Sequence, residues 1–418
     1  MLAATASIAG CHSGGQTGPQ TTPYLQPIPP IGSLARPKSL GQTGVPAEAT
    51  RAAIPADNPQ TPEKIALGQQ LFFDGRLSAD GTVACSTCHD PVRAFTDGRS
   101  VSVGIRNTPG QRNAPTVLNA LYNKTQFWDG RARTLEEQAG FPIINPAEMG
   151  QPSLQAAVTR IAAVSKYRKA FQKVFGRAPN GSDLLRAIAA YERTQISFDS
   201  PFDRFIAGDQ SAINISAKRG WALFQGRGRC TKCHALSKDK LDVTNFTDHD
   251  FHNIGVVTVQ RDVVEMARQA EGVNPHDMPA VDRTAIQSRL SALGRFLVTR
   301  KESDIGAFKT PNLRNLLLTE PYFHDGSHQT LWDVIDHYNK GGDVNDPYLD
   351  PDMQPLGMKE PEIDDLVSFL ASLTSPDYRE PALKELARQR KLSKSTRPDR
   401  DSARAFGPKP LRSELPRG

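Results

Sequence analysis

The pattern Cys-x-x-Cys-His occurs twice in this chain of 418 residues, and no other feature constrains its fold as strongly. The first copy lies in "ACSTCHD" at residues 84–90, and the second is "CTKCH" at residues 230–234. Two thiols followed directly by an imidazole can form half of a zinc site, a redox dithiol or the attachment point of a c-type haem. The residues concerned are Cys85, Cys88 and His89 in the first copy, and Cys230, Cys233 and His234 in the second.

The segments that lead into the two copies are also alike. Each contains Gly-x-x-Leu-Phe, starting at Gly68 or at Gly220, and then Gly-Arg before the first cysteine. A match of this length indicates duplication of a whole domain. Zinc would need both repeats to meet at one metal, and a dithiol of the thioredoxin type would need a βαβ setting that the sequence does not show. We therefore predict a dihaem protein in which each cysteine pair binds one porphyrin and the adjoining histidine binds its iron.

The spacing of apolar residues predicts mainly helices. Residues 183–196 follow Ser182, the expected N-cap, and carry Leu184, Ile188 and Tyr191 on one face. Residues 216–225 and 360–373 also have helical character, whereas convincing strands are few. We expect a mainly α fold with two cytochrome c-like haem domains that arose by internal duplication, and with long loops.

The expected organisation has four parts. Residues 1–50 form a signal-like start and a Pro/Gly-rich linker, 51–207 the N-terminal haem domain, 208–378 the C-terminal haem domain and 379–418 a basic tail. The tail carries 12 Lys/Arg and 5 Asp/Glu, so the net charge of +6 belongs to it and residues 1–378 sum to about −1. We predict a solvated, disordered tail, with a docking surface for an acidic partner as the alternative. Nothing in the rest of the chain indicates nucleic-acid binding.

The first residues resemble the end of a bacterial lipoprotein signal. The letters "IAGC" at 8–11 stand in the place of a lipobox, although the basic and apolar regions of a full signal peptide are missing. Cys11 is therefore either a lipid anchor or an incidental cysteine. No run of apolar residues approaches the length of about 18 residues that a membrane span requires. Because c-type haem is attached outside the cytoplasm, we predict an exported, periplasmic protein.

The nine histidines are unevenly distributed, and none lies between His89 and His234. The segment that follows the first haem motif therefore cannot supply a second imidazole to that haem. This matters because the sixth ligand of a haem iron and the groups around it decide what the haem does.

Eight motifs spread over residues 60–375 are informative together. They are "LFFDGRLSADGTVACSTCHDP", "RNAPTVLNA", "FWDGRARTLEEQA", "NPAEMG", "FHNIG", "GAFKTPNLRNL", "PYFHDGS" and "TLWDVIDHYNKGG". In these motifs the sequence resembles the bacterial dihaem cytochrome c peroxidase family, which includes the MauG-type maturases of methylamine dehydrogenase. The resemblance covers about three quarters of the chain.

The resemblance implies roles for individual residues. Glu148 matches the acid–base carboxyl beside the peroxide-binding N-terminal haem, and heterolysis of a peroxide needs such a proton carrier. Gln138 matches an amide of the same pocket. Trp128 matches the indole between the two haems, where an aromatic ring can bridge electron tunnelling.

Further matches concern the space between the haems and the second haem. Asn113 and the main-chain carbonyls of Thr319 and Pro321 match the ligands of a calcium ion, which prefers oxygen donors. His324 matches a residue that supports a propionate of the second haem.

Two positions depart from the pattern of many family members. The loop histidine that holds their first haem at rest falls at or near Ile105 here. We therefore predict a first haem that is five-coordinate or water-ligated and that meets peroxide without prior reductive activation. For the sixth ligand of the second haem, register with the family favours Tyr338, as in MauG-type proteins, with Met353 and then Met358 as alternatives. A phenolate would lower the potential of this haem, and a thioether would raise it.

Three functions are compatible with these features. The first is reduction of hydrogen peroxide, with electrons from a small cytochrome c or cupredoxin through the second haem. The second is MauG-type oxidation of a protein substrate by peroxide, and the third is a purely electron-transferring dihaem cytochrome. The resemblance also implies a homodimer as one possible assembly. Residues 257–300 exceed what the flanking motifs require and are expected to form an inserted helical element near the second haem.

Overall fold

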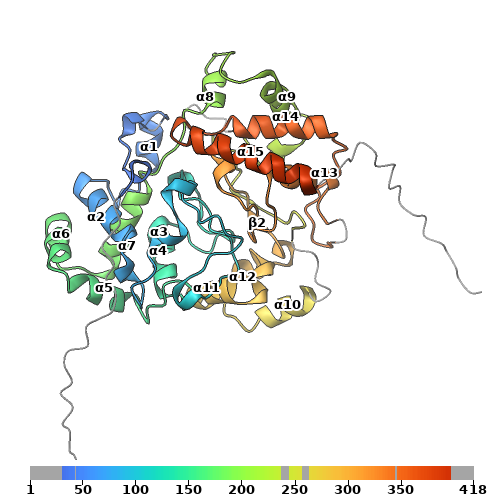
Figure 1. The fold of residues 1–418 in the computed structure, drawn as a ribbon. Coiled ribbons are helices and arrows are strands. Elements are labelled where there is room, and N and C mark those ends of the chain that lie inside the picture. The colour runs from blue at the N-terminus through green and yellow to red at the C-terminus, as the bar shows by residue number, and fades with distance from the viewer. Residues whose placement is uncertain (1–30, 43, 237–243, 257–262, 344–345, 397–418) are drawn as a thin grey trace, which may run out of the picture.

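The computed structural model describes residues 31–42, 44–236, 244–256, 263–343 and 346–396. The described residues are mainly helical, and their only sheet is a short antiparallel pair of strands, so the prediction of a mainly α fold with long loops is confirmed (Figure 1). The helices of the first half are α1 (Ala47–Ala53), α2 (Pro62–Phe72), α3 (Cys85–Cys88), α4 (Leu135–Ile144), α5 (Leu154–Ala162), α6 (Ser165–Phe175) and α7 (Gly181–Glu192).

The second half has more helices and the two strands. Its helices are α8 (Pro201–Ile206), α9 (Ile215–Gln225), α10 (Val263–Ala270), α11 (Met278–Gln287), α12 (Phe296–Thr299), α13 (Leu331–Lys340), α14 (Glu360–Ala371) and α15 (Arg379–Thr396). The strands are β1 (Phe251–His252) and β2 (Phe308–Lys309), with Phe251 opposite Lys309. Short 3-10 helices connect many of these elements.

The duplication is visible in how the helices cross. In the first half α2 packs against α7, and in the second half α9 packs against α14. A Cβ on Gly68 of α2 would lie 1.8 Å from the carbonyl oxygen of Ala187, and a Cβ on Gly220 of α9 would lie 1.9 Å from that of Asp365. The same glycine of the repeated Gly-x-x-Leu-Phe motif therefore permits the same close helix crossing in both halves.

One hydrophobic core extends through both halves. In the first half Phe72 of α2 meets Tyr191 of α7 with ring centroids 5.2 Å apart, and in the second half Phe224 of α9 meets Phe369 of α14 at 4.9 Å. Asn180 caps α7 by accepting a hydrogen bond from the Asp183 amide at 3.0 Å, so the predicted cap, Ser182, is wrong by two residues.

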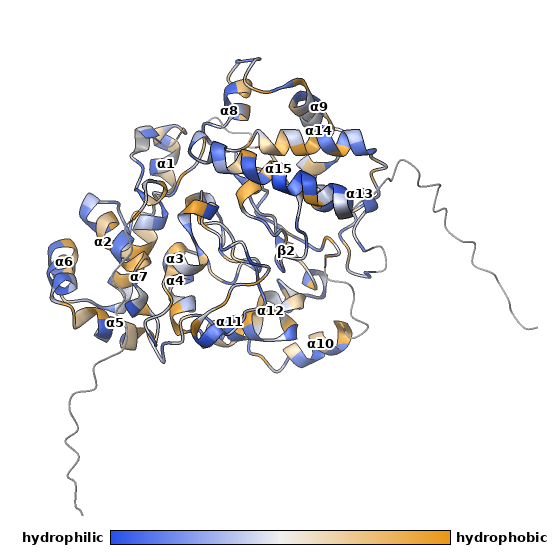
Figure 2. Cartoon of the chain, in the orientation of Figure 1, coloured by the Kyte–Doolittle hydropathy of each residue, from blue (hydrophilic) through white to orange (hydrophobic). Residues whose placement is uncertain are grey.

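The prediction of a disordered tail from residue 379 is wrong for its first part, because residues 379–396 form α15. Most of its residues are hydrophilic (Figure 2), but Ala382, Gln389 and Ser393 are buried. The side-chain oxygen Oε1 of Gln389 accepts a hydrogen bond from the main-chain amide of Leu331 at 3.0 Å, and its Nε2 donates one to the Tyr322 hydroxyl at 2.9 Å. A few buried small or polar side chains thus hold this helix against the rest of the molecule, although its composition alone indicates disorder. Residues 397–418 lie outside the described part.

The inserted element was expected near the second haem. Part of it packs instead against the first half of the molecule. Its helices α10, α11 and α12 share a small core that includes Met266, Val281 and Phe296. However, Asp282 of α11 pairs with Arg131 of the first half, with 2.8 Å between Arg131 Nη2 and Asp282 Oδ1. Burial of this ion pair brings α11 to the first half of the molecule.

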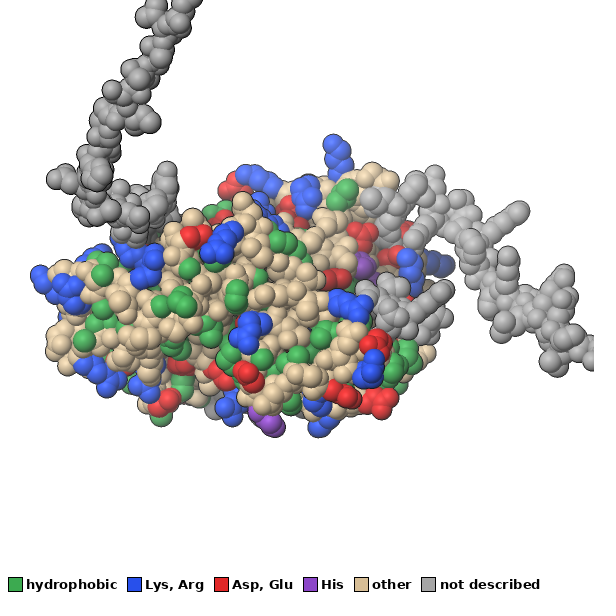
Figure 3. Space-filling model, turned by 90° about the horizontal axis from the view of Figure 1, so that it is seen from below, with side chains coloured by type: hydrophobic (Ala, Val, Ile, Leu, Met, Phe, Trp, Pro, Cys, Tyr) green, Lys and Arg blue, Asp and Glu red, His purple; other side chains and the backbone are tan. Residues whose placement is uncertain are grey.

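On the face seen in Figure 3, acidic and basic side chains are scattered among uncharged ones, and the described residues form no extended patch of one charge sign there. None of the helices in the described part of the chain combines the length and apolar character that a membrane crossing requires. The predicted anchor, Cys11, lies outside the described residues.

Candidate active site

The first Cys-x-x-Cys-His segment lines a cavity in the first half of the molecule. Cys85 and Cys88 lie on α3, and His89 follows directly. His89 Nδ1 lies 3.0 Å from the carbonyl oxygen of Phe95. Because a carbonyl can only accept, Nδ1 carries the proton and Nε2 keeps the lone pair that an iron ligand needs. Burial lowers the pKa of His89, which favours this neutral form.

The second segment lines a second cavity in the same way. Cys230 begins a 3-10 helix (Cys230–Lys232), and the ring of His234 is held by a bond of 2.8 Å between Nδ1 and the carbonyl oxygen of Phe246. Burial lowers the pKa of His234 and raises that of the Cys230 thiol to about 12. Each cavity therefore offers two thiols and one oriented, neutral imidazole, which is the donor set that a covalently attached haem requires.

Glu148 also lines the first cavity, in the turn that follows α4. Its amide donates to the carbonyl oxygen of Asn145 at 3.1 Å, and its own carbonyl accepts from the Ile105 amide at 2.8 Å. Its Oε2 is buried and has no hydrogen-bond partner among the described residues. Burial and the neighbouring Asp282 raise the pKa of Glu148 to about 8, against an opposing effect of Arg131. Gln138 of α4 lines the same cavity.

The first cavity has one imidazole among its described lining residues, that of His89. Ile105, at the position of the expected loop histidine, is buried in the main core. A Cβ on Gly150 would lie 2.1 Å from Ile105 Cδ1, so the isoleucine fills the space beside the Glu148 turn.

A cluster of buried charges beside Glu148 was not recognised from the sequence. Arg131 lines the cavity and lies between two carboxylates, at 2.9 Å from Asp129 and 2.8 Å from Asp282, with its guanidinium 3.5 Å from the ring centroid of Phe127. Arg112 adds a second cation 3.7 Å from Asp129. The motif "FWDGR" contains Asp129 and Arg131 and could have indicated this pair. Nothing local marks Asp282, since its partner is about 150 residues away in the chain.

Trp128 lines both cavities. Its indole Nε1 donates to the carbonyl oxygen of Asn113 at 2.9 Å, and its own carbonyl accepts from the Lys309 amide at 2.7 Å. The ring thus belongs to the wall that separates the two candidate haem sites.

The three residues expected to bind calcium line one cavity. Asn113, Thr319 and Pro321 all line the second cavity, and Asn113 lines the first as well. The Asn113 amide donates to the carbonyl oxygen of His324 at 2.8 Å. His324 is buried in the second cavity and stacks on Phe308 with a centroid distance of 3.5 Å. Burial and the charge of Arg112 keep the pKa of His324 well below its ordinary value.

The candidates for the sixth ligand of the second haem differ in position. Tyr338 of α13 and Met353 both line the second cavity. Met358 is buried in the main core, and its main-chain amide and carbonyl are both bonded to the side chain of Asn339. Tyr338 and Met353 are therefore the better placed candidates. Burial and the two thiols of the cavity raise the pKa of Tyr338.

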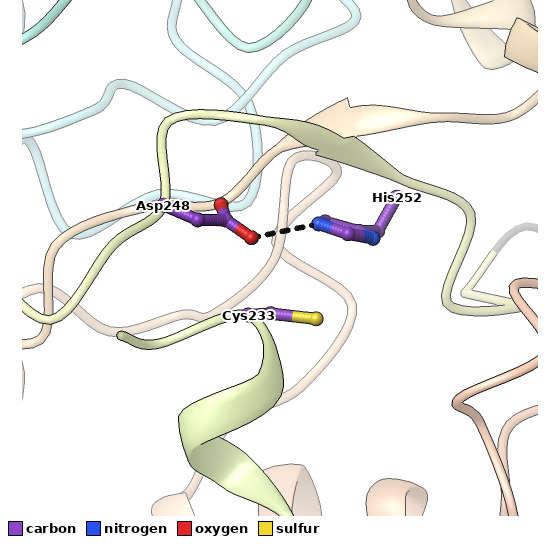
Figure 4. A group of neighbouring side chains, drawn as sticks. All are labelled: Cys233, Asp248 and His252. Atoms are coloured by element: carbon purple, nitrogen blue, oxygen red, sulfur yellow. Dashed lines mark hydrogen bonds and ion pairs between the residues drawn. The ribbon is translucent and has the colours of Figure 1, made fainter. Parts of the chain in front are cut away.

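Cys233, Asp248 and His252 lie close together (Figure 4), with their ligand atoms within 4.8 Å of one another, and Cys233 and His252 line the second cavity. His252 lies between Asp248, at 3.0 Å, and Asp350, at 2.6 Å, and hydrogen bonds in this group raise the pKa of the imidazole to about 11. Because Cys233 belongs to the haem-attachment motif, we interpret the cluster as part of the second haem site and not as a separate metal site.

Comparison with known proteins agrees with these two sites. The family model described as di-haem cytochrome c peroxidase matches residues 62–211. The chain is 41% identical over 321 residues to the methylamine utilization protein MauG of Methylorubrum extorquens, covering 76% of this chain and 80% of that protein. It is 34% identical over 373 residues to the cytochrome-c peroxidase IdrP1 of Pseudomonas sp. (strain SCT), covering 88% and 90%.

A solved structure is similar as well. The crystal structure of a MauG-like protein associated with microbial copper homeostasis has a TM-score of 0.62 and 31% sequence identity, and the match covers 79% of this chain and 95% of that one. The chain therefore belongs to the di-haem cytochrome c peroxidase family, which implies two c-type haems.

Proposed function

We propose that this protein reduces hydrogen peroxide to water at the first haem, with electrons delivered through the second haem from a small cytochrome c or cupredoxin. The reaction consumes one peroxide, two electrons and two protons and yields two molecules of water. The observation that carries the proposal is Glu148, a carboxyl in the first cavity whose buried oxygen has no partner and whose pKa of about 8 lies near neutral pH. The haems, when bound, supply the redox chemistry.

The residues of the first cavity handle the proton and the position of the substrate. Ionised Glu148 accepts a proton from one peroxide oxygen and returns it to the other, which then leaves as water. Gln138 can orient the peroxide by hydrogen bonding, and the charge of Arg131 favours the ionised state of Glu148. Trp128, in the wall common to both cavities, provides the path for electrons between the two sites.

The proposal is tested by rapid mixing of peroxide with the fully oxidised and with the half-reduced protein, with a reduced cytochrome c as donor. We expect both forms to consume peroxide without a lag, because His89 is the one imidazole among the described residues that line the first cavity. A protein that reacts only after partial reduction would contradict the predicted open first haem. A protein that consumes no peroxide in either form would contradict the proposed function.

MauG-type oxidation of a protein substrate is the second candidate, because Tyr338 lines the second cavity and a relative named MauG shares 41% identity. In this case peroxide would react but the added cytochrome c would stay reduced. A purely electron-transferring cytochrome would leave the peroxide unconsumed.

Replacement of Tyr338 by phenylalanine tests the sixth ligand of the second haem. We expect Tyr338→Phe to change the absorption and EPR signals of one haem and to raise its reduction potential, because loss of a phenolate removes negative charge from the iron. Met353→Leu is the matched control at the same cavity and should leave both signals unchanged. The reverse result would assign the ligand to Met353.

Other assignments accompany this proposal. We propose a calcium ion at Asn113, Thr319 and Pro321, which bring possible oxygen donors from two segments to the lining of one cavity. A periplasmic location follows from covalent haem attachment. The domain boundaries at 207 and 378, the lipid anchor at Cys11 and a homodimer remain predictions.

A further inference from the structure

Helix α11 of the inserted element has no part in the function proposed above, yet it reaches the first cavity. Ile286 lines that cavity although it lies far along the chain, in the second half. The 3-10 helix that follows α11 (Arg289–Leu293) also reaches the first half, because Ser291 accepts hydrogen bonds from the guanidinium of Arg112 at 2.5 Å on its hydroxyl and 2.7 Å on its carbonyl.

Two side chains of α11 hold the turn that carries Glu148, and both act on Asn145. The carboxylate of Asp282 accepts a hydrogen bond from Asn145 Nδ2 at 2.6 Å, and Gln287 Nε2 donates to Asn145 Oδ1 at 2.8 Å. Asn145 is 1% exposed and begins the turn. Its side-chain oxygen accepts from the Ala147 amide at 3.0 Å, and its carbonyl accepts from the Glu148 amide at 3.1 Å.

Asp282 also fixes the charge that Glu148 faces. Its second carboxylate oxygen accepts a hydrogen bond from Arg131 Nε at 2.8 Å, and both side chains are almost fully buried. The charged groups that act on Glu148 are Asp282 on α11 and Arg131 after Trp128, with opposite effects on its proton affinity. Behind them, Asp129 balances the charge of Arg131, and Arg112 adds a second positive charge beside Asp129. The other titratable side chains among the described residues of the cavity lining are Glu192, His89 and the two cysteines, whose thiols are consumed when haem is attached.

We propose that Asp282 is a positioning residue for Glu148, holding its turn through Asn145 and holding Arg131 beside it. Gln287 assists through the same asparagine. This inference rests on the proposed acid–base role of Glu148. It implies that α11, an element of the second half, contributes to the function of the first haem site. An amide at position 282 would keep the shape of the side chain but lose its charge and could no longer accept from both partners.

The pH dependence of cyanide affinity tests this proposal in the haem-loaded full chain at equilibrium, without turnover. Binding of hydrogen cyanide releases a proton that Glu148 accepts, so affinity falls as the pH drops below the pKa of Glu148. In Asp282→Asn, Glu148 loses a neighbouring negative charge and keeps the positive charge of Arg131, so its pKa falls. The midpoint of the change in cyanide affinity with pH should therefore move to lower pH by about one unit. Glu271→Gln removes one carboxylate from an exposed position of the same inserted element and should not move it.

Glu148→Gln distinguishes failure of the proposed acid–base role from failure of the positioning role. We expect this variant to lose the pH step altogether. If it does, and the midpoint of Asp282→Asn stays at the wild-type value, the positioning role of Asp282 is refuted while the proposed function stands. If Glu148→Gln keeps the step, the role of Glu148 fails and the positioning role fails with it.

A second variant covers the case that Asp282→Asn does not load haem. The side chain of Gln287 is exposed, so Gln287→Ala should fold, and it removes only the hydrogen bond to Asn145. We expect cyanide association to slow by up to about fivefold, because the turn loses one hydrogen bond and holds Glu148 less often in the position that accepts the proton, with an unchanged midpoint. An association rate equal to that of the wild type would refute the clamp on Asn145.

Discussion

Replacement of Glu148 by glutamine is expected to lower the rate of peroxide reduction by about 10²- to 10⁴-fold, the usual contribution of a general acid–base group. Glutamine has nearly the same shape but cannot carry the proton between the two peroxide oxygens. The measurement is stopped-flow consumption of peroxide by the haem-loaded protein with a reduced cytochrome c. Glu63→Gln, at an exposed position of α2, is the matched control and should retain the wild-type rate.

The same experiment has a defined pH dependence. Burial and Asp282 raise the pKa of Glu148 to about 8, so the carboxyl is mostly protonated below that pH and mostly ionised above it. Because the ionised form accepts the first proton, the wild-type rate should increase with pH up to about 8 and then level off. Glu148→Gln should show no such increase. A variant with the wild-type rate and the wild-type pH profile would refute the role of Glu148.

The second large effect is expected on stability, from Asp129. This carboxylate is fully buried, at 0% exposure, and lies 2.9 Å from Arg131 and 3.7 Å from Arg112. Arg112 is buried as well, and the poor solvation of its charge lowers its pKa to about 10. Asp129→Ala would leave two buried guanidinium groups with a single carboxylate, that of Asp282. We expect the free energy of unfolding to fall by about 3–5 kcal/mol, as for other broken buried ion pairs.

Denaturant titration of the haem-loaded protein, followed by circular dichroism, measures this loss. Asp377→Ala is the control, because it removes a carboxylate that is 48% exposed and pairs with Lys38 on the surface. Its effect should stay within about 1 kcal/mol. If Asp129→Ala were no more destabilising than this surface variant, the buried cluster would not contribute to the fold as described.

The local features of the site could be predicted from the sequence because each depends on a short stretch of chain. Cys-x-x-Cys-His fixes two thiols and an imidazole within five residues, and both copies line cavities. The repeated glycine, Gly68 and Gly220, indicated the duplication and lies at the close helix crossing in both halves. Glu148 and Trp128 were predicted through motif resemblance; both line the first cavity, and their roles stay predictions.

Other features could not be predicted, because they depend on which distant segments meet. The order of α15 comes from a few buried contacts such as those of Gln389, which charge composition does not reveal. Met358 and Met353 have the same chemistry in the sequence, and only their packing separates the core residue from the one that lines the cavity.

The sequence by itself determined the two Cys-x-x-Cys-His segments at which we expect haem attachment and, through the resemblance, the carboxyl that we expect beside the first of them, because covalent chemistry and short motifs are local. The tertiary structure decided the environment of that carboxyl. Asp282 is separated from Arg131 and Asn145 by more than 130 residues, yet it is bonded to both. The proton affinity of Glu148 depends on charges within a few ångströms in space, and only the folded chain brings them together.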